Sequence, residues 1–138
     1  MVRVLSIFGY LIFALNISIS DLKFRIIRNR DLLWFSGFTF VLNWKQFSSQ
    51  TFIQILVATL LLATLHLVFS GRIGAGDLKL FWIISFWPTS FSSWLQSFSL
   101  CWVLGGISSA FFVLIFRRYN GNIPFAPFIF SGFFASIL

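Results

Sequence analysis

The chain has 138 residues, of which 59% are hydrophobic and only 9% are charged, and its net charge is +7. A soluble domain carries about 25% charged residues, so this composition excludes a soluble globular protein, and its apolar content excludes a disordered chain. Long unbroken apolar runs, without the alternating polarity of barrel strands, predict an all-α membrane protein.

The basic residues indicate membrane topology rather than nucleic-acid binding. Ten Lys and Arg stand against three Asp. They lie between apolar runs and form no aromatic–basic platform for bases, so we expect no nucleic-acid partner. The single cysteine, Cys101, excludes an internal disulfide and a cysteine-based zinc site, and we expect it to be a small buried apolar residue.

Six apolar runs follow one another along the chain. They cover residues 4–20, 32–44, 52–70, 80–92, 94–116 and 123–138. A membrane-spanning helix needs about 20 apolar residues, whereas the second and fourth runs give only about 20 Å of helix each and, taken alone, could be re-entrant. The first run does not end in a small-residue cleavage pattern, so we expect no signal-peptide cleavage.

The distribution of basic residues favours six crossings. With the N-terminus outside, the loops 21–31, 71–79 and 117–122 are cytoplasmic and hold four, two and two basic residues, which is eight of the ten in the chain. Four crossings would put the two richest basic loops on opposite sides, against the positive-inside rule. We therefore predict a polytopic bundle of about six transmembrane helices, forming a single domain over residues 1–138.

The three acids carry most of the functional information. Asp21 follows the first run, Asp31 opens the second, and Asp77 follows the third. Six crossings put all three on the cytoplasmic side. Two carboxyl groups in a partly dry site share one proton, so the ionised acid can activate water against a peptide carbonyl while the protonated acid stabilises the oxyanion. The alternative is that these acids pair with neighbouring cations at helix ends or remain solvated.

Two glycines favour the catalytic interpretation. Gly74 and Gly76 come shortly before Asp77, and glycine permits positive φ and the close backbone approach that an extended substrate needs. A plain turn between helices is the alternative. A phosphate loop is not predicted, because Lys79 is not followed by Ser or Thr. The lone His66 is interpreted as a packing or cavity residue, so no serine or cysteine protease arrangement competes.

Three segments carry recognisable motifs in a fixed order. Residues 74–79 (GAGDLK) match a G-x-G-D-x-K signature, and residues 21–29 (DLKFRIIRN) contain an Asp followed eight residues later by an Asn. Residues 123–127 (IPFAP), with Gly132 beyond them, are similar to a Pro-Phe-Gly-Pro element. Together these motifs resemble those of the type IV prepilin peptidases, and the resemblance covers nearly the whole chain.

The resemblance implies an intramembrane-type aspartic endopeptidase with Asp21 and Asp77 as its catalytic pair. Such an enzyme is a multi-pass protein of the bacterial cytoplasmic (inner) membrane. It cuts the basic leader from prepilins or pseudopilins after a Gly at the cytoplasmic face, and it needs no metal or organic cofactor. The chain resembles the short form, without the Cys-x-x-Cys domain linked to methylation. It departs from the family at Arg28, where a Pro is usual, and at Ala126, where a Gly is usual.

Five further residues are candidates for shaping the site. Asp31 is interpreted as a contact for the basic leader or as a helix N-terminal acid favoured by the dipole. Lys79 would contact a substrate acid or a lipid phosphate, or it only marks the cytoplasmic side. Asn29 would orient the first catalytic acid or cap the second helix. Pro124 and Pro127 are expected to break or kink the start of the last helix and, by the resemblance, to line the site.

Other functions are compatible with the same patterns. One is a small membrane transport or pilus-assembly subunit whose acids bind ions or protons; an inactive relative of the peptidases that only scaffolds assembly is another. Presenilin-like proteases also use G-x-G-D, but they carry a Pro-Ala-Leu element that this chain lacks. The sequence names neither the pilin, competence or secretion system served nor the oligomeric state.

Overall fold

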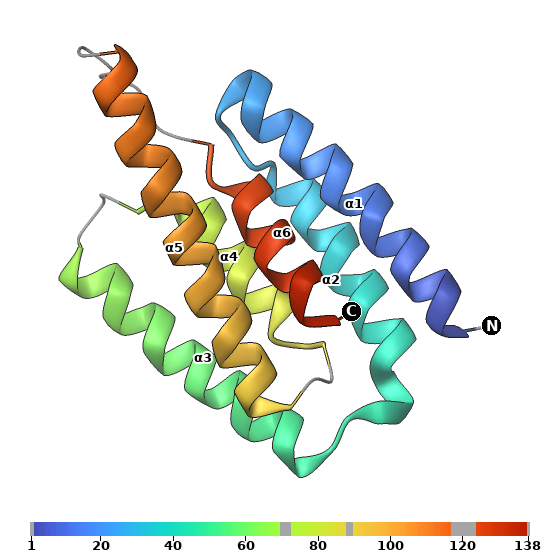
Figure 1. Cartoon of the computed structure of the whole chain (residues 1–138). Helices are drawn as coiled ribbons and strands as arrows, with labels where there is room; N and C mark the ends of the chain where they lie inside the picture. Colours follow the sequence, from blue (N-terminus) through green and yellow to red (C-terminus); the bar gives the residue numbers. More distant parts are fainter. Residues whose placement is uncertain (1, 70–72, 88–89, 117–123, 138) are drawn as a thin grey trace.

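The computed structural model of the chain (Figure 1) describes residues 2–69, 73–87, 90–116 and 124–137. These residues form six α-helices and no strand, which confirms the predicted all-α class. The helices are α1 (Val2–Phe24), α2 (Asn29–Asn43), α3 (Ser49–Val68), α4 (Ala75–Ile84), α5 (Phe91–Phe116) and α6 (Ala126–Ile137), and the 3-10 turn η1 (Trp44–Gln46) lies between α2 and α3.

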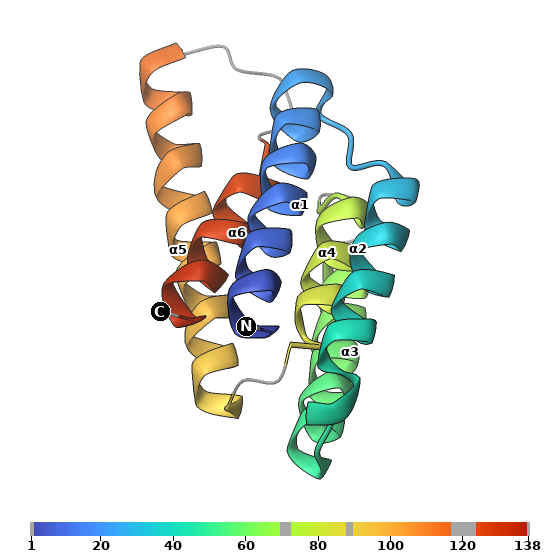
Figure 2. The same ribbon diagram turned by 90° about the vertical axis from the view of Figure 1, so that its right-hand side faces the viewer.

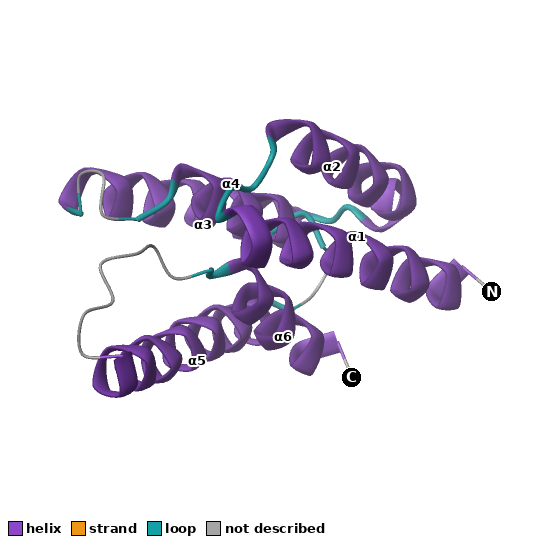
Figure 3. Ribbon diagram, turned by 90° about the horizontal axis from the view of Figure 1, so that it is seen from above, coloured by secondary structure: helices purple, strands orange, loops and turns teal. Residues whose placement is uncertain are grey.

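Consecutive helices run in alternate directions (Figures 1 and 2). One end of the bundle therefore gathers the last turns of α1, α3 and α5 and the first turns of α2, α4 and α6. The short helix α4 contacts α2, α3 and α6, while α1 packs on α2 and α6; Figure 3 gives the view from above. Because three helices surround it, α4 lies in the middle of the bundle.

α1 turns one face toward the core. Tyr10, Ala14, Ile17 and Asp21 are all less than a tenth exposed, and their spacing of three and four residues puts them on one side of a helix. The hydroxyl group of Tyr10 donates a hydrogen bond to the carbonyl oxygen of Phe130 at 3.1 Å, which joins α1 to α6. Asp21 thus lies on the same face of α1 as the apolar residues of the core.

α4 differs from the apolar run expected at 80–92. It begins at Ala75 and ends at Ile84, so Asp77 lies in its first turn rather than in a loop. The N–H of Asp77 donates to the carbonyl oxygen of Gly74 at 3.0 Å, and an acid in the first turn of a helix is favoured by the dipole. With ten residues, α4 is only about 15 Å long, about half the thickness of a bilayer's hydrocarbon core.

An amide from α3 holds the far end of α4. Gln54 is 1% exposed, and its Nε2 atom donates hydrogen bonds to the carbonyl oxygens of Ser85 at 3.0 Å and Trp87 at 3.2 Å. These carbonyls follow the last turn of α4, where carbonyl groups have no partner within the helix. Gln54 therefore joins α3 to the end of α4.

Replacing Gln54 by Leu is expected to lower the free energy of unfolding by about 2 kcal/mol, because two buried carbonyl groups lose their donor. The measurement is the unfolding midpoint of the purified protein in detergent. Gln50→Leu, one turn earlier on α3, is the matched control, since Gln50 is exposed and its replacement should change the midpoint little. Equal losses in the two variants would contradict this role for Gln54.

The outer surface is strongly apolar. Within the described part of the chain, the segments Ser6–Phe24 and Ser49–Val68 are long and apolar enough to cross a membrane. Large apolar side chains are exposed on several helices, which is unusual for a soluble monomer. The most exposed include Leu33, Val41, Leu67 and Leu114, each more than 70% exposed.

Candidate active site at one end of the bundle

Asp21 is buried near the end of α1, where it is 5% exposed. Because α1 continues beyond the first apolar run to Phe24, this acid belongs to the helix itself. The Oδ2 atom of Asp21 accepts a hydrogen bond from the backbone N–H of Ala126 at 2.9 Å. Ala126 is the first residue of α6, where free N–H groups and the helix dipole favour a negative charge. The last helix of the chain therefore holds the carboxylate of the first.

Asp77 is partly buried in the first turn of α4, outside both segments that are long enough to cross a membrane. Burial, together with the negative charge of Asp21, raises the pKa of its carboxyl group to about 7, and burial has the larger effect. The two carboxyl groups are therefore close enough for the charge of one to act on the other. The fold brings the two predicted acids together at one end of the bundle.

The two glycines before Asp77 make room for neighbours. A Cβ atom on Gly74 would lie 2.8 Å from the Oδ2 atom of Asp77, and a Cβ atom on Gly76 would lie 3.0 Å from the Cβ atom of Ile27. Neither glycine has the positive φ that the sequence suggested: Gly74 has φ −61°, and Gly76 is helical. Both positions need glycine because it has no Cβ atom, and not because of its conformational freedom.

The loop between α1 and α2 closes over the start of α4. Arg25 has φ 54°, the left-handed conformation that commonly ends a helix, and its N–H donates to the carbonyl oxygen of Asp21 at 2.7 Å. Two residues later, the side chain of Ile27 lies against Gly76. The first turn of α4 is thus covered by the segment that follows Asp21.

The polar residues near the pair bind one another. Lys79 donates from Nζ to the Oδ1 atom of Asn29 at 3.1 Å, which ties α4 to α2. The expectation that Asn29 caps α2 is wrong, because Arg28 occupies the N-cap position and no side chain caps it. Asp31 lies in the first turn of α2, with the Nε atom of Arg30 at 3.9 Å from its carboxylate. It therefore occupies the N-terminal position that the dipole favours.

The two prolines flank the start of α6, as expected. Pro124 precedes the helix, which begins at Ala126, and Pro127 lies in its first turn. Proline is tolerated in a first turn, because the N–H that it lacks would have no partner within the helix. Ala126, which lies between the two prolines and donates to the carboxylate of Asp21, has no exposed surface. The sequence did not predict that the backbone N–H of Ala126 binds Asp21, because almost every residue type has the same main-chain donor.

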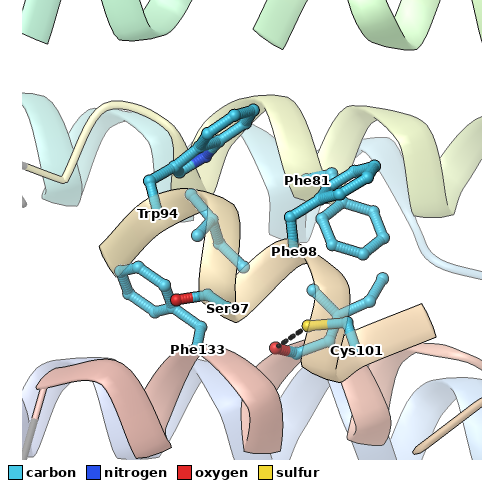
Figure 4. Close-up of a pocket in the computed structure, with 8 residues that line it drawn as sticks. Phe81, Trp94, Ser97, Phe98, Cys101 and Phe133 are labelled. Atoms are coloured by element: carbon cyan, nitrogen blue, oxygen red, sulfur yellow. Dashed lines mark hydrogen bonds between the residues drawn. The ribbon is translucent and has the colours of Figure 1, made fainter. Parts of the chain in front are cut away.

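A small apolar cavity, lined by neither acid, lies between α4, α5 and α6 (Figure 4). Its polar groups are satisfied locally: the thiol of Cys101 donates to the carbonyl oxygen of Ile129 at 3.2 Å, and Ser97 donates to that of Ser93 at 2.7 Å. Cys101 is 1% exposed, which confirms its prediction as a small buried residue. The cavity is a gap in the packing, and half of its lining residues are aromatic.

Other chemistry has little support in the described structure. His66 lies in the last turn of α3 and is exposed, so its interpretation as a packing or cavity residue is wrong. Among the residues that the structure describes, no group of three or more His, Cys, Asp or Glu side chains is arranged to hold a metal ion. The paired acids are the remaining candidates for catalysis.

A comparison with protein families matches residues 8–137 to the type IV leader peptidase family. Comparisons with curated proteins and with solved structures gave no significant match. The family match includes both acids, the loop over α4 and almost all of α6. Because it covers nearly the whole chain, the protein belongs to the type IV leader peptidase family, a family of membrane-associated peptidases.

Proposed function

We propose that the protein is an aspartic endopeptidase of the membrane that removes the basic leader from type IV prepilins or pseudopilins, with Asp21 and Asp77 as its catalytic pair. Family membership supports a leader peptidase. The observation that carries the aspartic mechanism is the electrostatic interaction between two carboxyl groups that α1 and α4 bring to one end of the bundle. Such a pair is suited to holding a single proton between two acids.

The surroundings of the two acids favour different roles. Asp21 accepts the N–H of Ala126 at the N-terminus of α6, and this contact stabilises its ionised form. Asp77 has a pKa of about 7 and so keeps its proton below neutral pH. Asp21 is therefore the general base, and Asp77 is the general acid.

Peptide hydrolysis follows from these roles. The carboxylate of Asp21 takes a proton from water as the water oxygen bonds to the carbonyl carbon of the substrate, while Asp77 gives its proton to the carbonyl oxygen. A neutral tetrahedral diol results, Asp21 is protonated, and Asp77 is ionised. Asp21 then protonates the amide nitrogen, and as the C–N bond breaks Asp77 takes the proton of one diol hydroxyl, which leaves a carboxylic acid and an amine. Both acids return to their starting forms.

The pH profile of cleavage is expected to fall on its alkaline side with an apparent pKa near 7. The pair needs one proton, which Asp77 holds below pH 7 and loses above it, so kcat/KM should drop about tenfold per pH unit well above neutrality. The measurement uses a peptide substrate without groups that titrate between pH 6 and 9. A rate that rises through this range would contradict the assignment of Asp77 as the acid.

We propose that the pair faces the cytoplasm in the bacterial cytoplasmic membrane. The cations at this end of the bundle support that orientation, because Lys23, Arg25, Arg28 and Arg30 are all exposed there and cytoplasmic loops and anionic lipid head groups favour positive charge. The N-terminus then lies outside, and the chain forms one polytopic domain.

The proposed function is tested by reconstituting the purified protein in liposomes with a prepilin-like peptide. The substrate carries a short basic leader, a Gly at its end and an apolar segment that anchors it in the bilayer. We expect one cut after this Gly, mapped by mass spectrometry of both products. Liposomes without protein are the control. An intact substrate at pH 6, with folded wild-type protein present, would reject the proposal.

A further inference from the structure

We infer that Phe125 is a positioning residue for the reaction proposed above, since its ring fixes the backbone N–H of Ala126 on the carboxylate of Asp21. The inference rests on the proposed function, because it concerns the geometry of the same acid pair. The role of the ring is indirect, because it acts through the residue that follows it in the chain.

The ring of Phe125 lies in a notch on α5. Its edge approaches Gly105 so closely that a Cβ atom on this glycine would overlap the ring. The ring of Trp102, one turn earlier on α5, has its centroid 5.5 Å from that of Phe125. At the neighbouring Gly106, no atom of the described residues, apart from the adjoining backbone of α5 itself, lies within 4 Å of the place that a Cβ atom would take, so the two glycines of α5 differ in their surroundings.

The backbone of Phe125 starts the helix that holds Asp21. Its carbonyl oxygen accepts the N–H groups of Phe128 at 3.1 Å and Ile129 at 3.2 Å, the first hydrogen bonds of α6. The next N–H along the chain, that of Ala126, donates to Asp21. A shift of Phe125 therefore moves the first turn of α6 and, with it, the donor on the catalytic base.

The same ring also contacts the helix of the second acid. Phe81 lies one turn after Asp77 on the buried face of α4, and its ring centroid is 6.4 Å from that of Phe125. Aromatic pairs at such separations attract each other beyond simple burial. Phe125 therefore links α5, the start of α6 and the helix of Asp77. The position of its ring against Gly105 helps to set the distance between the two carboxyl groups.

The experiment compares Gly105→Ala with Gly106→Ala in the liposome assay. The methyl group at 105 displaces the ring, so kcat should fall about 100-fold, as expected for a shift of about 1 Å at a catalytic group. KM should stay within about threefold, because the ring does not bind substrate. Gly106→Ala adds the same methyl group to open space and should leave kcat and KM at the wild-type values.

A second-site variant separates positioning from general damage to the fold. Phe125→Leu removes the two ring atoms that a methyl group at 105 would approach most closely, so the Gly105→Ala/Phe125→Leu double variant should recover at least about tenfold in kcat over Gly105→Ala alone. Phe125→Leu by itself should lower kcat with KM unchanged. Unfolding midpoints of all variants show whether each is folded under the assay conditions.

The outcomes distinguish the two proposals. A wild-type kcat in folded Gly105→Ala, or in folded Phe125→Leu, overturns the role of Phe125 and leaves the peptidase proposal standing. Additive losses in the double variant overturn it as well. If Gly105→Ala does not fold, the kcat of Phe125→Leu decides. Absence of cleavage by the wild-type protein would instead reject the proposed function itself.

Discussion

Replacing either Asp21 or Asp77 by Asn is expected to lower kcat for leader cleavage at least about 1,000-fold, because in the proposed mechanism each acid carries a proton transfer that the amide cannot perform. Asn keeps nearly the shape of Asp, so the packing of α1 and α4 should survive. The double variant should be little worse than either single one, since the two acids act as a unit. The measurement is single-turnover cleavage of the liposome-anchored peptide.

Stability measurements separate lost chemistry from lost structure in these variants. The pKa of Asp77 is raised from 3.8 to about 7, so the folded protein binds this proton more tightly than the unfolded chain does. The contribution of Asp77 to stability is therefore full below about pH 4 and is lost as the pH rises toward 7. Asp77→Asn avoids this loss, so its unfolding midpoint at pH 8 should equal or exceed that of the wild type.

The third acid provides the comparison for catalysis. Asp31 lies at the same end of the bundle, but its carboxylate is near Arg30 in the first turn of α2. Asp31→Asn should keep kcat within about threefold of the wild type, whatever its effect on KM, because it takes no part in the proton transfers. Full activity of Asp21→Asn or Asp77→Asn would remove the basis for an aspartic mechanism.

Gly132→Ala is expected to give the largest loss of stability among single methyl additions, about 3 kcal/mol. The new Cβ atom would lie 2.5 Å from the Sγ atom of Cys101, 2.9 Å from its backbone nitrogen and 3.1 Å from the carbonyl oxygen of Ser97. Two of these three atoms belong to the backbone of α5 and cannot turn away. The helices α5 and α6 must therefore separate, and the midpoint of unfolding in detergent measures the cost.

Gly106→Ala on α5 is the matched control for this loss. Beyond the adjoining backbone of α5, no part of the described structure lies within 4 Å of its Cβ position. Alanine also favours a helix over glycine by about 1 kcal/mol, so the midpoint of this variant should rise slightly or stay unchanged. Removing the thiol as well, with Cys101→Ala, should recover only part of the loss in Gly132→Ala, because the backbone contacts persist. Similar midpoints for Gly132→Ala and Gly106→Ala would show that α5 and α6 do not pack closely at Gly132.

The helical class was predictable because hydropathy alone determines it in so apolar a chain. The start of α4 was not, because the sequence before Asp77 has the composition of a turn. A hydropathy pattern locates the apolar part of a helix, whereas its ends depend on capping and on local hydrogen bonds. Here Gly74 accepts the first hydrogen bond and Asp77 occupies the first turn, so the helix begins five residues before the apolar run.

That Asp21 and Asp77 interact could be predicted, because charges are rare in this chain and costly when desolvated. Their partners could not. The contact of Ala126 with Asp21 joins residues 105 positions apart, and it uses a main-chain donor that any residue but proline supplies. The role of Gly76 likewise depends on Ile27, a contact that follows only from how the loop folds over α4.

The hydrogen bond between Asp21 and Ala126 has a consequence for how the chain is assembled during synthesis. Synthesis delivers both acids long before the ribosome reaches α6, so a growing chain contains the reactive groups without the donor that stabilises the base. Under the proposed mechanism, Asp21 gains this donor only when α6 packs beside α1.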